Sequence, residues 1–429
     1  MAIILPGFAR WRRADSRIKR IRSIDDRLIL TPSRRIARVA PTDKRIIAIT
    51  FDDGPTKLPT SPDISGGAAL TDYLLDELRA FGSRATFTVI GSTAKNYPDT
   101  SGPPGTQFAH GRRFDHFAGF GLDDMAGAEA SPDLVRRIAR EGHDLANHTY
   151  RHIIFGKSPT IYPTREALSG FDEAVEDLQR LHNLIYKLTR FDMRFMRPPH
   201  YIDTMADGKT SFDACEELGY HYLATTLDCG GGLPGDGVYV ADVAALVRPV
   251  RRALERNPAS LSGQIISLKD SFNFTRQSPV ATALRQILEL LDRHNYRVVP
   301  VSELVYESPF EDLRPTDDCF EPVRALDRAG FALGFRNNRF YAERQITKSE
   351  LPTIFTLPST VKDVAALTSR RPDTRLRSVR VDRRDTAPVR LISARAAEVF
   401  EKVSGQPKSN SRADVAAWIC ELAAENGII

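Results

Sequence analysis

The chain has 429 residues, 41% of them hydrophobic, and a formal net charge of +5 from 60 Lys and Arg against 55 Asp and Glu. This length and composition are enough for one large and one smaller globular domain. Because charges of both signs are plentiful and mixed, the small positive excess indicates an ordinary solvated surface, and nucleic acid is not an expected partner. No apolar run approaches the ~20 residues that a transmembrane helix needs.

Residues 1–43 are rich in arginine and are predicted to form a basic arm or amphipathic helix on a solvated surface. The N-terminal apolar stretch AIILPGF is soon interrupted by Arg10, Arg12 and Arg13, so it is too short for the apolar region of a secretory signal peptide. As written, the sequence shows no export signal. The cysteines have no paired spacing that would predict a disulfide framework or a zinc-thiolate site; they are Cys215, Cys229, Cys319 and Cys420.

Residues 44–310 alternate strand-like runs with helical patterns. The runs are IIAIT, ATFTVI, YHYLATTL, QIISL and RVVPV. Between them, the segment DEAVEDLQRLHNLIYKL places Leu178, Leu181 and Ile185 at helical spacing. This alternation predicts a parallel α/β sheet or barrel, in which side chains at the carboxyl ends of the strands share one face.

Potential metal ligands follow two of these runs. TFDDGP places Asp52 and Asp53 directly after the first strand-like run, and HDLANHTYRH contains His148 and His152 four residues apart. On a helical turn this spacing stacks two imidazoles on one side. Asp53 and the two histidines would then form a site with two nitrogens, one carboxylate and open positions. A histidine pair at this spacing is by itself weak evidence, because ordinary surface or core histidines often share it.

Four motifs in this order, TFDDGP, HTYRH, RPP at 197–199 and IISLKD, resemble the polysaccharide deacetylases of carbohydrate esterase family 4. The resemblance covers roughly residues 45–305. It implies a deformed (β/α) barrel that hydrolyses acetyl groups on an N-acetylated or O-acetylated polysaccharide or oligosaccharide, such as peptidoglycan or a chitin-like glycan. It also implies a divalent metal; Zn²⁺ is expected, with Co²⁺ or Mn²⁺ as alternatives.

Carried over residue by residue, the resemblance assigns the metal to Asp53, His148 and His152. Asp52 matches the general base, and Arg197 matches the arginine that orients and ionises this base. The next residues of the same motif are expected to bind the substrate; they are Pro198, Pro199, His200 and Tyr201.

The chain departs from the family pattern in three places. Lys269 stands where most relatives have a histidine, so it either protonates the leaving amine or stabilises the oxyanion by its charge. TTLDCGGG retains Asp228 but has glycines in place of a second Asp and a Trp, which predicts a different floor of the substrate cleft. A Gly-rich insertion precedes the histidines and is interpreted as a surface loop, with a lid over the sugar site as the alternative.

Residues 311–429 are predicted to form a small, mostly helical C-terminal domain. Within it, Pro322–Leu351 resembles an S-layer homology repeat: an apolar helix, a turn around Gly330 and Gly334, and the sequence ITKSE. Such repeats imply binding to cell-wall polysaccharide; a helical appendage without wall affinity is the alternative.

The substrate class implies a location at the cell surface or outside the cytoplasm, whereas the missing signal peptide leaves the cytoplasm open. A second interpretation of the whole chain is a catalytically weak or inactive glycan-binding protein of the cell wall. Asp52 and Arg197 favour catalysis, because a protein that only binds needs neither a base nor the arginine that orients it.

Overall fold

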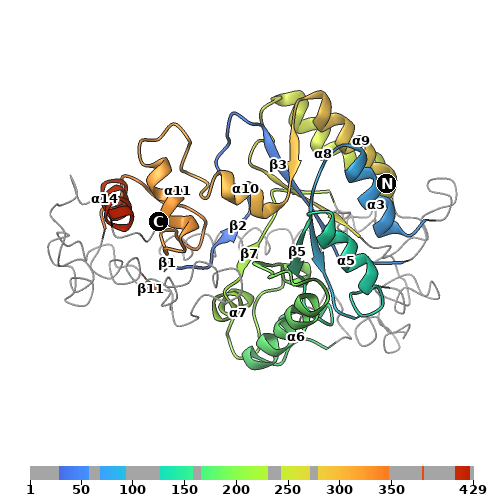
Figure 1. Ribbon diagram of the computed structural model, residues 1–429. Helices are drawn as coiled ribbons and strands as arrows, with labels where there is room; N and C mark the ends of the chain where they lie inside the picture. Colours follow the sequence, from blue (N-terminus) through green and yellow to red (C-terminus); the bar gives the residue numbers. More distant parts are fainter. Residues whose placement is uncertain are drawn as a thin grey trace, which may run out of the picture.

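A computed structural model describes residues 29–57, 68–92, 126–157, 166–229, 243–270, 279–346, 379–380 and 411–425. Figure 1 shows a large α/β unit and, beside it, a smaller part that contains the helices α11 and α14. Four segments that the sequence analysis singled out lie outside the described residues: the start of the basic arm, the Gly-rich insertion, the glycines after Asp228, and most of ITKSE. Within the described residues, no helix is long and apolar enough to cross a membrane.

The centre of the α/β unit is a nine-stranded sheet. Its strands are β2 (Arg35–Ile36), β3 (Ile46–Asp52), β4 (Thr86–Val89), β5 (Asp144–Asn147), β6 (Phe195–Met196), β7 (His221–Leu223), β8 (Leu227–Asp228), β9 (Ile265–Lys269) and β10 (Arg297–Val299). All of its pairings are parallel, in the order β2-β7-β6-β5-β4-β3-β9-β8, and β10 pairs with the start of β3.

A short bend turns this sheet into a ring. Strand β7 pairs with β6 on one side, strand β8 pairs with β9 on the other, and only residues 224–226 separate the two strands. The ring closes through this irregular segment and through an isolated bridge between Arg38, after β2, and Gln264, before β9. The predicted deformed (β/α) barrel is confirmed by this strand order and by the helices around it.

Six helices of the described chain alternate with these strands: α3 (Leu70–Ala80), α5 (Pro132–Arg140), α6 (Phe171–Thr189), α7 (Ser211–Leu218), α8 (Val243–Arg256) and α9 (Pro279–Arg293). Helix α6 buries Leu178, Leu181 and Ile185, so the stripe expected from the sequence is confirmed. Helix α7 begins with a reciprocal capping box between Thr210 and Asp213, in which each side chain accepts a hydrogen bond from the other residue's backbone N–H.

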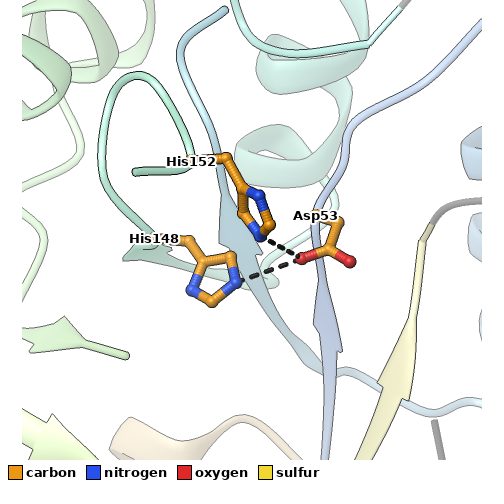
Figure 2. A group of neighbouring side chains, drawn as sticks. All are labelled: Asp53, His148 and His152. Carbon is orange, nitrogen blue, oxygen red and sulfur yellow. Dashed lines mark hydrogen bonds and ion pairs between the residues drawn. The ribbon is translucent and has the colours of Figure 1, made fainter. Parts of the chain in front are cut away.

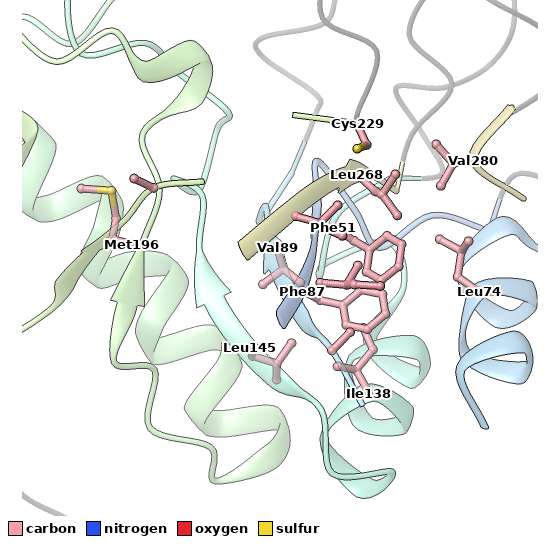
Figure 3. Packing of buried hydrophobic residues seen from close by; sticks show 14 of the residues in the cluster. Phe51, Leu74, Phe87, Val89, Ile138, Leu145, Met196, Cys229, Leu268 and Val280 are labelled. Carbon is pink, nitrogen blue, oxygen red and sulfur yellow. The ribbon is translucent and has the colours of Figure 1, made fainter. Parts of the chain in front are cut away.

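The two faces of β3 pack into two different cores, because successive side chains of a strand point to opposite sides. Ile47, Ile49 and Phe51 join the large cluster between sheet and helices, where Phe51 stacks on Phe87 with ring centroids 5.0 Å apart (Figure 3). Ile46 and Ala48 join a smaller cluster whose members also come from β2, β5, β6, β7, β9 and β10. This smaller cluster is the interior of the ring.

A third cluster, here called the C-terminal cluster, joins both ends of the described chain. It combines Leu30 of β1 (Ile29–Leu30) with residues 310–346, including α11 (Phe320–Arg328), and with α14 (Arg412–Glu425). Residues 310–346 follow α10 (Val301–Glu307) in the chain. Strand β1 also pairs antiparallel with β11 (Val379–Arg380). The helical content expected after residue 310 is therefore present.

The N-terminal boundary differs from the expected one. Residues 1–43 were assigned to a solvated arm, but β2 pairs with β7, and Leu30 is fully buried in the C-terminal cluster. Arg34 between them donates a hydrogen bond to the carbonyl oxygen of Pro309 at 3.0 Å and forms an ion pair with Asp327 at 3.1 Å. The segment from residue 29 onward thus ties the barrel to the C-terminal cluster.

We predict that Leu30→Ala lowers the free energy of unfolding of the C-terminal cluster by about 2–5 kcal/mol, because it leaves a cavity between N-terminal and C-terminal segments. Tryptophan fluorescence during urea denaturation measures this, since Trp418 packs against the cluster and the chain has only 2 Trp. Tyr306→Ala, at an exposed side chain, is the control and should shift the transition much less. An unchanged transition in Leu30→Ala would show that β1 contributes nothing to this core.

Candidate active site

The register of the strands brings the predicted site residues to one end of the ring. Asp52, the last residue of β3, lies opposite Thr88 of β4 and Lys269 of β9. Asn147 of β5 lies opposite Met196 of β6, so the next residues, His148 and Arg197, leave their strands side by side. All of these positions are at carboxyl ends of parallel strands, where open α/β folds and barrels bind ligands.

The two-residue period of the strands also selects the polar side chains that face the ring interior. On β3, Ile46 and Ala48 belong to the interior cluster, so Thr50 and Asp52 continue the same face. By the same alternation, Arg197 continues the face of the interior residue Phe195. The interior is therefore apolar toward the amino ends of the strands and polar at their carboxyl ends.

The side chains of Asp53, His148 and His152 converge on one point (Figure 2). The Nε2 atoms of both histidines lie 3.1 Å from Oδ1 of Asp53. All three side chains are at most 4% exposed. Two ligand atoms at about 2.0–2.1 Å from a tetrahedral zinc ion are separated by about 3.3 Å, so these spacings suit a shared metal ion.

Hydrogen bonds and burial favour metal ligation by these groups. Nδ1 of His148 lies 2.7 Å from the backbone oxygen of Arg197, which can only accept, so Nδ1 donates and Nε2 is the atom directed at the candidate metal position. Burial lowers the pKa of His152 to about 4, so this ring is neutral at pH 7. Burial acts to raise the pKa of Asp53, but Lys269 and the two histidines outweigh it and hold this pKa well below its usual range. The predicted ligand set is chemically fit for a divalent ion.

The histidine pair is not on a helix, so the helical turn expected from its spacing is wrong. Residues 148–152 form a loop in which Thr149 and His152 have positive φ angles of 66° and 49°. Two local side-chain bonds hold this loop: Thr149 N–H donates to Oδ1 of Asn147 at 3.0 Å, and Ile153 N–H donates to Oγ1 of Thr149 at 3.0 Å. Such bonds compete with helical ones, and they place the two imidazole centroids 5.1 Å apart at 56°.

Asp52 points to different partners from those of its neighbour. Its Oδ1 accepts hydrogen bonds from Nη1 of Arg197 and from the hydroxyl of Thr88. The same Nη1 donates to Oγ1 of Thr50 at 2.8 Å. Arg197 is 1% exposed and Asp52 13% exposed, so the guanidinium is buried behind a carboxylate that still reaches solvent. An acid held in this way is oriented and remains accessible.

Lys269 reaches the metal-ligand carboxylate. Its Nζ lies 2.6 Å from Oδ2 of Asp53, and its side chain is 20% exposed. Asp228, at the end of β8, is exposed and accepts a long hydrogen bond of 3.4 Å from the hydroxyl of Ser267. Asp228 is thus on the same rim, where its carboxylate interacts electrostatically with Arg197.

The residues expected to bind substrate form the next part of the rim. Pro198 and Pro199 are buried, and the His200 ring lies 5.7 Å from that of His152. The Tyr201 ring stacks on Tyr222 at 6.4 Å, and its hydroxyl oxygen is buried without a hydrogen-bond partner. Such a hydroxyl is costly unless a ligand or water satisfies it.

A buried carboxylate next to the site was not anticipated. Asp270 is fully buried, and its backbone N–H donates to the backbone carbonyl oxygen of Asp52 at 2.7 Å. Its side chain accepts from the hydroxyl of Thr71 at 2.7 Å, and Thr71 in turn accepts from the backbone N–H of Thr56 at 2.8 Å. Burial raises the pKa of Asp270 to about 7. The network braces both sides of the Asp52–Thr56 turn; the polar Asp270 after an apolar strand was the only sequence signal for it.

Comparison with known proteins agrees with the motifs. Residues 39–223 match the family model of the polysaccharide deacetylases. A peptidoglycan-N-acetylglucosamine deacetylase of Bacillus cereus is 27% identical over 277 residues, which is 64% of this chain and 95% of that protein. A chitin deacetylase of Colletotrichum lindemuthianum is 25% identical over 187 residues, 44% of this chain and 53% of that one.

A solved structure of a peptidoglycan N-acetylglucosamine deacetylase has a TM-score of 0.41 at 21% identity and covers 63% of this chain and 92% of that chain. This score is too low to support a fold assignment, which rests on the strand order above. The polysaccharide deacetylase resemblance is supported for the barrel; its relatives are named as deacetylases of peptidoglycan and chitin.

We predict that Gly54→Ala disturbs the metal-ligand turn, because a Cβ at this position would lie 2.2 Å from Oδ2 of Asp270. Overpacking of this kind costs about 1–3 kcal/mol and should weaken metal binding, measured by calorimetric titration. Gly82→Ala is the control for backbone strain away from the site: Gly82 has φ 59°, but a Cβ there would meet nothing within 4 Å, so this variant should leave metal affinity unchanged. Metal affinity that stays unchanged in Gly54→Ala would contradict the bracing role.

Proposed function

We propose that the protein is a metal-dependent hydrolase that removes acetyl groups from an N-acetylated or O-acetylated glycan. One observation carries the proposal: two consecutive carboxylates point to different partners. Asp53 faces His148 and His152, and Asp52 faces a buried arginine. Two ligand nitrogens with one carboxylate favour zinc, cobalt or manganese over calcium. Proteins similar to this chain are named peptidoglycan and chitin deacetylases, which supports these glycans as substrates.

In this proposal Asp52 is the general base. A divalent ion held by Asp53, His148 and His152 supplies Lewis acidity toward water and toward the acetyl carbonyl oxygen. Asp52 accepts the proton of the attacking water as its oxygen bonds to the carbonyl carbon. Arg197 keeps the carboxylate oriented by its hydrogen bond.

The leaving group requires a proton donor on the same rim. The bond from the carbonyl carbon to the sugar nitrogen or oxygen breaks, acetate is released, and the leaving atom takes a proton. Lys269 is the candidate, as proton donor or as a charge that stabilises the oxyanion, because it ends β9 on the same rim as Asp52. Tyr201 is a candidate hydrogen-bond donor to substrate, because its buried hydroxyl has no hydrogen-bond partner among the described residues.

The metal-loaded full chain should release acetate from N-acetylated peptidoglycan fragments or chitin oligosaccharides. Asp52→Asn should lower kcat about 10²- to 10⁴-fold with metal content unchanged, the usual contribution of a general base. His148→Ala should lose both metal and activity. His294→Ala is the matched control, because its Nδ1 also faces a backbone oxygen, at 2.9 Å, but at the opposite end of the barrel. A metal-loaded chain that releases no acetate from any of these glycans would contradict the proposed activity.

We further propose that the C-terminal region associates with cell-wall polysaccharide and that the protein works at the cell surface. The support is the resemblance of residues 322–351 to an S-layer homology repeat, together with the wall glycans named for its relatives. The full chain should co-sediment with purified cell walls, with serum albumin as control. Saturating acetylated oligosaccharide should not release it, since a separate surface would bind the wall. Complete release by the oligosaccharide, or no co-sedimentation, would contradict this proposal.

A further inference from the structure

The charge on Lys269 bears on the metal as well as on the chemistry. Asp53 uses its two oxygens for different purposes: Oδ1 faces both histidine nitrogens at 3.1 Å, and Oδ2 faces the Lys269 ammonium at 2.6 Å. The carboxylate is 4% exposed, so it needs a cation or several hydrogen-bond donors nearby. Lys269 thus places a full positive charge in direct contact with this buried carboxylate.

We propose that Lys269 is a built-in competitor of the metal ion: its ammonium neutralises Asp53 in the metal-free protein and lowers the affinity of the site for divalent cations. This inference rests on the proposed metal site. It assigns to Lys269 a role that is separate from proton transfer and that is measurable without substrate.

A second group that contacts a metal ligand can either raise or lower the metal affinity of the site. A hydrogen-bond donor that only orients a ligand strengthens metal binding, and its removal typically weakens affinity about 10- to 100-fold. A full positive charge beside the ligand carboxylate repels a dication. It also partly neutralises the negative charge that would attract the ion. Because the ammonium contacts the same carboxylate that would hold the ion, repulsion outweighs orientation. Removal of the charge should therefore tighten binding.

The ion pair also stabilises the metal-free fold. Without Lys269, the buried Asp53 carboxylate would lose the ammonium that lies 2.6 Å from it, and breaking a buried ion pair from one side is destabilising. A bound dication would replace the lost charge. The metal-free variant should therefore melt at a lower temperature than the metal-free wild type, and the rise in Tm on metal addition should be larger in the variant.

The same competition couples metal binding to the position of Lys269. A dication held by Asp53 would weaken the attraction between this carboxylate and the ammonium, because one carboxylate would then be shared by two cations. The lysine side chain, which is 20% exposed, could then turn toward bound substrate. In the metal-free protein it is held by Asp53.

The test compares zinc affinity and melting of the full chain after removal of metal by a chelator. Lys269→Met removes charge and hydrogen bond, and Lys269→Gln removes the charge while keeping a donor. In both, zinc should bind at least about 10-fold more tightly than in the wild type, measured by competition with a chelator of known affinity. Lys269→Arg keeps the charge and should bind zinc no more tightly than the wild type.

Lys44→Met is the matched control. Lys44 forms an ion pair of the same length, 2.6 Å, with Glu307, but it lies two residues before the start of β3, at the other end of the strand from the metal ligands. It should leave zinc affinity unchanged. Equal affinity of Lys269→Met and wild type would overturn the proposal, and weaker binding by Lys269→Met would show that the lysine only positions Asp53. If neither protein binds zinc, cobalt or manganese, the metal site itself is refuted, and this proposal with it.

Discussion

The backbone reversal at Asp53 is the constraint on which the site depends. Asp52 ends β3 with its side chain on the interior face of the ring, and Asp53 turns into the left-handed region with φ 76°. In a continued strand the two carboxylates would point to opposite sides of the sheet, and Asp53 would enter the helix-facing core. The reversal brings both to the same rim with separate partners. Asp tolerates a positive φ better than most residues, and such strain is stored at functional sites where the surroundings hold it.

Arg197 connects this turn to other strands and loops of the ring. It belongs to the chain just after β6; its side chain donates to Asp52 and Thr50 on β3 and to the backbone oxygens of Leu223 and Ala224 at 3.3 and 3.4 Å. Its own backbone oxygen accepts from His148. A single buried residue therefore connects β3, the loop after β5, and the irregular bend that closes the ring. The proposed base, one candidate metal ligand and the bend between β7 and β8 are therefore ordered together.

The sequence predicted that Asp53, His148 and His152 lie together, as they do, because polar residues follow the strands and parallel strands end on one rim. The roles of Asp52 and Arg197 came instead from the family resemblance. Sequence reasoning failed where distant contacts decide the structure. The spacing of His148 and His152 suits a helix, but side-chain bonds from Asn147 and Thr149 to the backbone favour a loop. In residues 29–43 only the basic composition was recognisable from the sequence. Strand β2 has two residues, too few to show the alternation of a strand, and its partner β7 lies far along the chain. The contact of Lys269 with Asp53 depends on the path of a long side chain, which no local pattern specifies.

The site uses two cations of different kinds, and the difference suits their carboxylates. The guanidinium of Arg197 is planar, almost fully buried and fixed by donors on several sides, so Asp52 has one orientation. The ammonium of Lys269 ends a flexible stem and is 20% exposed, so its pairing with Asp53 can be broken at lower cost. A base must hold one geometry through the reaction, whereas a metal ligand must exchange one cation for another. An arginine at the second position would hold Asp53 too firmly, and a lysine at the first would leave the base poorly oriented.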